Sequence, residues 1–268
     1  MAQAARSVSS KEIRRLVLEE AKRAGVGHIG SGLSVADLVA ALYGGVLRIE
    51  SPDDPERDRF VLSNGHAALA LYSALHLRGW ISREQLATYC APETLLGVHP
   101  EHELTGVDFS TGSLGQGISM AAGAALAARL QGSPRRAFAI VSDAECDEGS
   151  VWEAAMFAAQ RRLSNLVVIV DRNHQQALGY TRDVIDHGAL VDRWRAFGWD
   201  AHDTDGHDVA GLQGLLNGFD YAAGPPHAVI AQTTFGRGVS FMESRIEWHY
   251  LPMNEEQYAL ARAEVMAS

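Results

Sequence analysis

Cysteine and long apolar runs are both scarce in this chain. Cys90 and Cys146 are the only cysteines among 268 residues and form no paired motif, so a reducing cytoplasm is the simplest compartment to expect. No stretch approaches the roughly 18 apolar residues that a membrane-spanning helix needs. The N-terminal segment MAQAARSVSSKEIRR lacks a long apolar segment, so no secretory signal is predicted. We therefore expect a cytoplasmic protein with no membrane partner.

Basic residues are also in short supply. The chain has 23 Lys and Arg against 33 Asp and Glu, which gives a net charge of -10 at pH 7. This balance argues against nucleic acid as a partner, whereas an anionic small molecule stays possible where local positive groups or a metal ion receive it. The hydrophobic content of 47% allows a sizeable core. Because no linker is visible, we expect residues 1–268 to form a single domain.

Short apolar segments alternate along the chain with segments of helical periodicity. The run LVVIV at 166–170 is typical of a strand that is buried on both faces of a parallel sheet. The alternation predicts an α/β fold, a doubly wound and mostly parallel sheet flanked by helices. We predict strands over 58–62, 137–142, 166–170, 199–203 and 228–233, a glycine-rich loop over 25–34, and helices over 9–24, 35–47, 118–130 and 254–265, with others after 66, 82 and 148. In the helix after 148, Trp152, Met156 and Phe157 are expected in the core.

Four acids follow the strand over 137–142 within six positions: Asp143, Glu145, Asp147 and Glu148. One interpretation is a favourable charge at the start of the next helix. Another follows from the fold, because ligands of such sheets lie at the carboxyl ends of the strands. On the sequence alone, both interpretations stay open.

Asp143 ends one predicted strand, and Asn173 follows the next. Both side chains would open on the same edge of the sheet. A carboxylate, an amide oxygen and a nearby backbone carbonyl are hard ligands that suit Mg²⁺ or Ca²⁺. The helix that follows Asp143 would direct free N–H groups to the same place, which favours a phosphate group.

The spacing of these residues resembles the thiamine diphosphate motif of transketolases. Glu148-Gly149 follows Asp143 by five residues and Asn173 follows it by thirty, although the family usually opens the motif with Gly-Asp-Gly and this chain has Ser142-Asp143-Ala144. Further segments resemble the family in the same order and span nearly the whole chain: GHIGSGLSVADL (27–38), RDRFVLSNGHAALALY (57–72), GVHPE (97–101), STGSLGQGISMAAGAALA (110–127), EGSVWEAAMFAA (148–159) and WHY (248–250). The chain is similar to the N-terminal, diphosphate-binding subunit of a split transketolase.

This resemblance implies a thiamine-diphosphate-binding fold and an enzyme that uses thiamine diphosphate with Mg²⁺ or Ca²⁺. The expected reaction moves a two-carbon ketol unit from a ketose donor to an aldose acceptor, and the cofactor supplies the difficult chemistry. The implied partner is a C-terminal transketolase subunit that carries the pyrimidine-binding domain, in a heterotetramer with two copies of each chain. The substrates would be small sugars.

The resemblance also assigns roles to particular residues. The implied metal ligands are Asp143, Asn173 and the backbone carbonyl of Gln175. The implied cofactor contacts are His66, Gly112, Leu114, Ala144, Glu145, Asn173 and His249. The implied catalytic residues are His28 and His99, which would face the substrate, and Glu148, which would join a carboxylate network between paired active sites.

Two residues depart from the family pattern. Ala144 adds a methyl group where the family keeps glycine for close approach to the diphosphate, and Ser113 replaces a proline that would stiffen its loop. Neither change removes a ligand, so we expect a working site with adjusted affinity. Two alternatives stay open: a thiamine diphosphate synthase chain that helps to condense a keto acid with an aldehyde, and a non-catalytic regulatory chain of the same fold.

Overall fold

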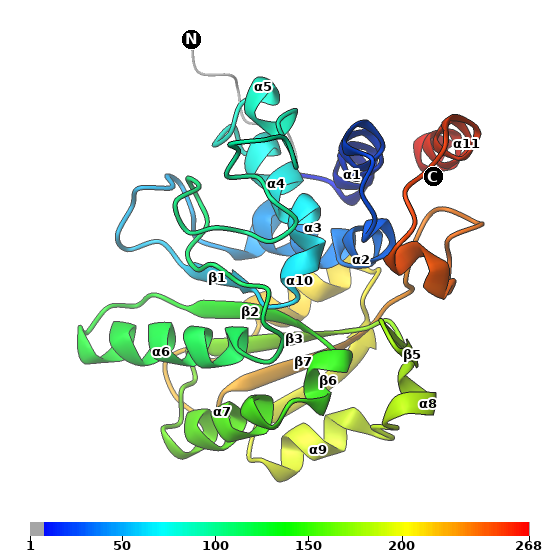
Figure 1. The fold of residues 1–268 in the computed structure, drawn as a ribbon. Coiled ribbons are helices and arrows are strands. Elements are labelled where there is room, and N and C mark those ends of the chain that lie inside the picture. Colours follow the sequence, from blue (N-terminus) through cyan, green and yellow to red (C-terminus); the bar gives the residue numbers. More distant parts are fainter. Residues whose placement is uncertain (1–7, 268) are drawn as a thin grey trace.

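A five-stranded sheet, in which every neighbouring pair of strands is parallel, forms the centre of the computed structural model, which describes residues 8–267 (Figure 1). The strand order is β1-β2-β3-β7-β6. The strands are β1 (Arg59–Leu62), β2 (Ala137–Ser142), β3 (Leu166–Arg172), β6 (Asp200–Asp205) and β7 (His227–Gln232). The predicted strands and the predicted fold class are confirmed. Residues 1–7, which belong to the segment where no secretory signal is predicted, lie outside the described residues.

Helices cover both faces of the sheet (Figure 1). Alternate residues of β2 enter two cores, since Phe138 and Ile140 pack on one side while Ala139 and Val141 pack on the other. The first face carries α1 (Ser10–Ala24), α3 (Ala36–Ala41), α4 (Ala68–Leu77) and α10 (Val209–Asn217), and the second carries α6 (Gly117–Leu130), α7 (Gly149–Gln160) and α9 (Leu190–Ala196). Both faces of the central strands are therefore buried, as their apolar runs predict.

Side-chain caps begin two of the helices. The Ser9 side chain accepts a hydrogen bond from the backbone N–H of Glu12 at the start of α1, 3.3 Å away. Ser82 and Gln85 form a complete capping box at α5 (Arg83–Leu86). The last helix, α11 (Glu255–Ala267), lies beside α1 (Figure 1).

The predicted glycine-rich loop over 25–34 is wrong in its second half. Helix α2 (Ile29–Ser34) begins inside it, and the helix predicted over 35–47 is divided into α3 and a π-helix over Leu42–Val46. The glycines serve close packing here, because a Cβ at Gly30 would lie 2.1 Å from the ring of Phe235. Tertiary packing thus overrides the weak helix propensity of glycine.

The expected core stripe of α7 is only partly correct. Trp152 stacks on Phe197 with ring centroids 5.0 Å apart. Met156 and Phe157, however, are 53% and 41% exposed. The helix buries small residues instead, and this lets it approach α6 closely: Val151, Ala154, Ala155 and Ala158.

Between β3 and α9 lies a short segment that the sequence analysis did not divide into elements. It contains the hairpin β4 (Gln175–Gln176) and β5 (Gly179–Tyr180), followed by α8 (Thr181–Val184). This segment lies beyond the carboxyl end of β3, where it can form a wall of a site. Across residues 8–267, no helix combines the length and apolar character needed to cross a bilayer.

Candidate active site

A cavity of about 440 Å³ opens beyond the carboxyl ends of β2 and β3. Its walls come from the start of α2, the turn after β2, the β4–β5 hairpin, α8 and the 3₁₀ helix over Ile246–His249. Eight of the predicted site residues line it: His28, His66, Leu114, Ala144, Glu148, Asn173, Gln175 and His249. Chain folding thus gathers residues that are spread over most of the sequence.

Three histidines of this cavity have lowered pKa values. His28 occupies the left-handed region (φ 59°) before α2, and its backbone N–H donates to the carbonyl of His249 at 3.1 Å. Its ring centroid lies 5.3 Å from that of His66. Burial, followed by the neighbouring histidines, lowers the pKa of His66 to about 3 and that of His249 to about 4. Burial, followed by His99, also lowers the pKa of His28. These imidazoles are therefore neutral near pH 7.

The orientation of His249 is fixed by stacking. Its ring lies 4.3 Å from the ring of Phe235, with an interplanar angle of 14°. Among the described residues, neither His249 Nδ1 nor His28 Nδ1 has a hydrogen-bond partner, although both atoms are buried. Gln175 likewise has a buried side-chain amide without partners in this part of the chain. Because buried polar groups are normally satisfied, the cavity wall is arranged to receive a polar ligand.

The predicted metal ligands lie together at this cavity, with Asn173 and Gln175 in its wall and Asp143 buried next to them. The Asp143 carboxylate is 1% exposed, and its Oδ2 accepts hydrogen bonds from the His174 backbone and the Thr181 hydroxyl, each 3.0 Å away. Asn173 Oδ1 accepts from the backbone N–H of Gln175 at 3.0 Å. The Asn173 side-chain NH₂ donates to Asp171, which pairs in register with Ser142 on the neighbouring strand.

The electrostatics of these residues suit a hard cation. Burial, followed by the charge of Asp171, raises the pKa of Asp143 to about 7. A cation bound by Asp143 and by the oxygens of Asn173 and Gln175 would offset two buried carboxylates. The donor set consists of oxygen atoms, as Mg²⁺ and Ca²⁺ require. The residues present therefore fit both a divalent metal ion and the diphosphate that such an ion would hold.

Three other predicted site residues lie around the cavity but not in its wall. Glu145 is fully buried behind the wall, where Ser63 and the backbone N–H groups of Gly115 and Ser142 donate to its carboxylate. His99 and Gly112 line an adjoining hollow. A Cβ on Gly112 would lie 3.0 Å from the ring of His99, so the glycine lets that ring pack against the loop.

The position of Ala144 explains how a departure from the family pattern is accommodated. Ala144 lies in a 3₁₀ helix over Ala144–Asp147 and is absent from the residues with positive φ, so its backbone does not require glycine. The residue lines the cavity. Its methyl group therefore reduces the space beside the turn without straining the chain.

Several wall residues were missed by the sequence analysis. Two polar examples, Ser31 and Gln176, carry no spacing signal and reach the cavity only through the fold. Ser142 and Asp147, which belong to the acidic turn, also line the cavity although no role was assigned to them. The rim is apolar and exposed, since Leu178 is 82% and Ile185 49% exposed. The sequence signal that could have found this rim is a group of aliphatic residues in the short segment after the strand that ends before Asn173. Aliphatic side chains outside the main strands and helices often mark a binding surface.

Comparison with known proteins agrees with this geometry. Residues 5–266 match the family model described as "Transketolase, thiamine diphosphate binding domain". The chain is 43% identical to the 6-deoxy-6-sulfo-D-fructose transketolase subunit of Clostridium sp. (strain MSTE9), across 94% of this chain and 93% of that protein. It is 38% identical to an apulose-4-phosphate transketolase subunit of Phocaeicola vulgatus, across 96% of this chain and 92% of that protein.

Among solved structures, the transketolase of Campylobacter jejuni superposes with a TM-score of 0.89 at 29% identity. The match covers 96% of this chain but 42% of that enzyme, so the chain corresponds in length to the subunit-type relatives and to a part of the undivided enzyme. These relatives do not favour a condensing synthase. The chain belongs to the transketolase family of transferases, as an N-terminal subunit with the thiamine-diphosphate-binding domain.

Proposed function

We propose that this chain supplies the diphosphate-binding half of a cytoplasmic transketolase and that residues 1–268 act as a single domain. The reaction transfers a two-carbon ketol unit from a ketose donor to an aldose acceptor. One observation carries the proposal: neutral, partly unsatisfied histidines and the Asp143–Asn173 pair meet at one cavity in a chain of subunit length. Two relatives are named for a phosphorylated and a sulfonated sugar, so anionic sugars are the first substrates to test.

The cofactor side of the site lies at the turn after β2. Thiamine diphosphate, when bound, supplies the carbon–carbon bond chemistry. Asp143, Asn173 and the backbone carbonyl of Gln175 would hold Mg²⁺ or Ca²⁺, and the charge of that ion would offset the charge of the diphosphate. The remaining contacts to the cofactor would come from residues around the cavity: His66, Gly112, Leu114, Ala144 and His249.

The substrate side lies at the mouth of the cavity and in the adjoining hollow. A neutral imidazole can accept one proton or donate another, so His28 can orient a sugar hydroxyl and move its proton. His99 would act on the same substrate from the hollow beside Gly112. Glu148 is exposed at the cavity wall, where it can pair with groups of a neighbouring site across a contact between chains.

The apolar rim supports the need for a partner. Leu178, Ile185 and Leu114 expose apolar surface beside a polar cavity, which is typical of a protein interface. The proposed partner is a C-terminal transketolase subunit that carries the pyrimidine-binding domain. Two copies of each chain would form a heterotetramer, since most assemblies of this kind are symmetric.

The decisive experiment compares the chain alone with the chain plus that partner. Each preparation receives thiamine diphosphate, Mg²⁺ and a panel of ketose phosphates and sulfonated ketoses, and multi-angle light scattering gives the assembly mass. We expect turnover only in the mixture. Full turnover by the chain alone, with no second protein detectable by mass spectrometry, would refute the split-enzyme proposal. Assembly and cofactor binding without turnover on any donor would instead support a regulatory role.

A further inference from the structure

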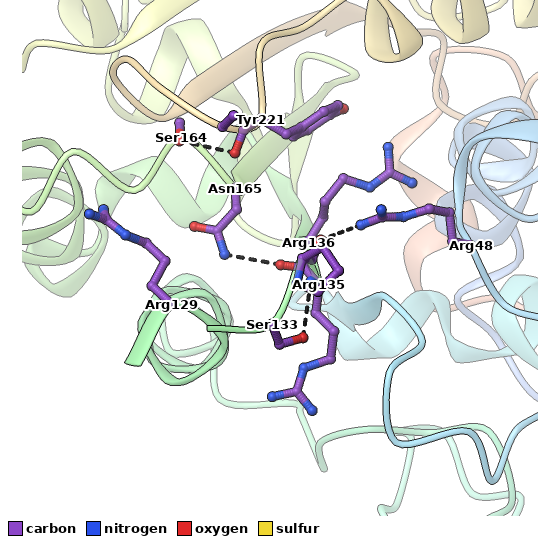
Figure 2. Close-up of a pocket in the computed structure, with 10 residues that line it drawn as sticks. Arg48, Arg129, Ser133, Arg135, Arg136, Ser164, Asn165 and Tyr221 are labelled. Carbon is purple, nitrogen blue, oxygen red and sulfur yellow. Dashed lines mark hydrogen bonds between the residues drawn. The ribbon is translucent and has the colours of Figure 1, made fainter. Parts of the chain in front are cut away.

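A second cavity, of about 350 Å³, lies at the amino ends of the strands, opposite the active site. Figure 2 shows the residues that line it. It is enclosed by the end of α6, the segment before β2, the segment before β3 and the loop around Tyr221. A strand of six residues separates the two cavities by roughly 20 Å. Four arginines contribute to its lining: Arg48, Arg129, Arg135 and Arg136.

Two of these arginines share one carboxylate. Arg48 Nη2 donates to Asp58 Oδ1 at 2.9 Å, and Arg136 Nε donates to Asp58 Oδ2 at 3.0 Å. Asp58 is 1% exposed, so its charge is committed to this pair of guanidinium groups. The Arg136 guanidinium also lies 4.7 Å from the centre of the Tyr221 ring, which holds it against the cavity wall.

The positive charge of Arg129 is not shared with a carboxylate of the described residues in this way. Its Nη1 donates to the backbone carbonyls of Arg161 and Arg162, at 2.7 and 2.8 Å. Within residues 8–267, no carboxylate makes an ion pair with Arg129. The Asp220 carboxylate, on the loop beside Tyr221, accepts hydrogen bonds from backbone N–H groups of its own loop.

The guanidinium of Arg135 is a separate case. Figure 2 shows it turned away from Asn165, and it donates to the carbonyl of Pro55 at 2.7 Å. The Glu56 carboxylate accepts from the Ser133 hydroxyl and lies 3.9 Å from Arg135 Nη1. The four guanidinium groups of the cavity wall are therefore set against two carboxylates, of Asp58 and Glu56. This local positive excess stands in a chain whose net charge is -10.

Asn165 adds a second and independent feature. The residue is 6% exposed, and its side-chain NH₂ donates to the carbonyls of Ala125 at 2.9 Å and Arg135 at 3.1 Å. These two bonds fix the amide orientation. Its Oδ1 is buried without a partner among the described residues, and Figure 2 shows this oxygen on the side that faces Arg129. A buried acceptor without a hydrogen bond lowers the stability of the protein. This oxygen is therefore suited to accept a hydrogen bond from a ligand hydroxyl.

We propose that this arginine-lined cavity binds a small phosphate monoester that carries hydroxyl groups, at a site separate from the active site. Guanidinium groups bind phosphate oxygens through paired, charge-assisted hydrogen bonds. A ligand hydroxyl donates to Asn165 Oδ1, which distinguishes such an ester from a bare anion. The volume lies at the small end of the range for small-molecule sites.

The test uses glycerol 3-phosphate as the probe and isothermal calorimetry as the readout, so it does not depend on turnover. The chain is first saturated with thiamine diphosphate and Mg²⁺ so that the active-site cavity is filled. We expect Arg129→Gln to weaken binding by about 10- to 100-fold, the loss typical of one charge-assisted hydrogen bond. Arg262→Gln makes the same charge change on the exposed surface of α11, outside the cavity, and should leave the affinity unchanged.

Two further probes separate the possible sources of binding. Glycerol lacks the phosphate and inorganic phosphate lacks the alcohol hydroxyl groups of the glycerol part, so both should bind at least about tenfold more weakly than glycerol 3-phosphate. Inorganic phosphate that binds as tightly as the ester would overturn the proposal, because the site would then hold an adventitious ion only. Loss of binding in His28→Ala rather than in Arg129→Gln would place the ligand in the active site and overturn it as well.

A spectroscopic measurement covers the case in which Arg129→Gln fails to fold. The side-chain amide of Asn165 gives an NMR signal in the unmodified chain, and glycerol 3-phosphate should shift it while glycerol does not. An unmoved Asn165 signal at probe concentrations that saturate the calorimetric binding would contradict the assignment.

Discussion

Glu145 Oε1 accepts a hydrogen bond from the backbone N–H of Gly115 at 2.9 Å and so joins the acidic turn to the loop that carries Leu114. The same oxygen accepts from the Ser63 hydroxyl at the end of β1, and Oε2 accepts from the backbone N–H of Ser142 at 2.8 Å. One buried carboxylate therefore fixes three segments that border the cavity. We infer that Glu145 positions these walls rather than contacting the cofactor.

Replacing Glu145 should consequently affect stability. In Glu145→Ala the buried donors of Ser63, Gly115 and Ser142 lose their acceptor, and we expect the free energy of unfolding to fall by about 2–4 kcal/mol. Glu145→Gln keeps one acceptor oxygen and should lose less. Urea denaturation measures both variants, with exposed Glu148→Ala as the control. Equal stability of Glu145→Ala and Glu148→Ala would contradict the positioning role.

Asp143→Ala should abolish metal-dependent cofactor binding while the fold is kept. Removal of a charged ligand at the strand end is expected to weaken the calorimetric affinity for thiamine diphosphate with Mg²⁺ by at least about 100-fold. Circular dichroism checks the fold. Asp183→Ala removes an exposed carboxylate from α8 and serves as the matched control. Normal cofactor affinity in folded Asp143→Ala would remove this residue from the metal site.

Ala144→Gly should strengthen cofactor binding. The substitution removes a methyl group from the cavity wall at a position where the family keeps glycine, and a gain of up to about tenfold corresponds to roughly 1.4 kcal/mol. Ala177→Gly removes a methyl group elsewhere in the same wall and provides the comparison. If calorimetry gives an unchanged or weaker affinity for Ala144→Gly, the methyl group does not restrict the diphosphate.

His28→Ala and His99→Ala should spare cofactor binding and lower turnover. We propose that each imidazole acts on the substrate, and a positioned acid–base group contributes roughly 10²- to 10⁴-fold in rate. The assembled enzyme with its partner is used, and kcat at saturating donor is compared with calorimetric cofactor affinity. His102→Ala changes an exposed histidine near the same hollow as a control. A variant that loses the cofactor but keeps its turnover at saturation would show that its role is misassigned.

The buried histidines also predict how stability depends on pH. The folded-state pKa of His66 is about 3, against 6.5 for the unconstrained side chain. Below pH 6.5 this histidine binds a proton in the unfolded chain but not in the folded chain. The free energy of unfolding therefore falls as the pH falls toward 3. The maximum slope is about 1.4 kcal/mol per pH unit for each such group.

His66→Gln should therefore flatten this dependence. Urea unfolding between pH 5 and pH 7 should show a smaller loss of stability in His66→Gln than in the unmodified chain. Above pH 7 the slopes of the two proteins should agree, because the His66 imidazole is then neutral in both the folded and the unfolded state. Identical slopes for His66→Gln and the unmodified chain at pH 5–6 would contradict this prediction. They would show that the His66 imidazole has the same pKa in the folded chain as in the unfolded chain.

Local sequence patterns were sufficient to predict the strands of the sheet and the edge at which the site lies. The apolar runs at 137–141 and 166–170 end in polar residues at one edge, so Asp143 and Asn173 could be placed together before the structure was known. Helix α2 was missed because its glycines oppose helix formation locally, and only tertiary contacts explain them: Gly30 packs against Phe235, and Gly32 packs against Val17. Propensity is a local quantity, whereas such packing depends on residues far along the chain.

The apolar rim and the arginine-lined cavity show a second limit of sequence patterns. Arg48, Arg129 and Asn165 have no common spacing, and each one alone is an ordinary polar residue. Their significance comes from the crossover connections that bring the amino ends of β2 and β3 side by side. A pattern of residues along the chain cannot record which loops meet at that end of a sheet.

The contact between the Phe235 ring and Gly30 has a consequence for the order in which the chain folds. The two residues are 205 positions apart, and the stacked His249 depends on the same contact. Contacts of such long sequence separation close large loops and tend to form slowly. A refolding chain can form much of its sheet before this contact forms. Thiamine diphosphate would then bind only the chains in which the contact is complete, and not the nearly native chains that still lack it.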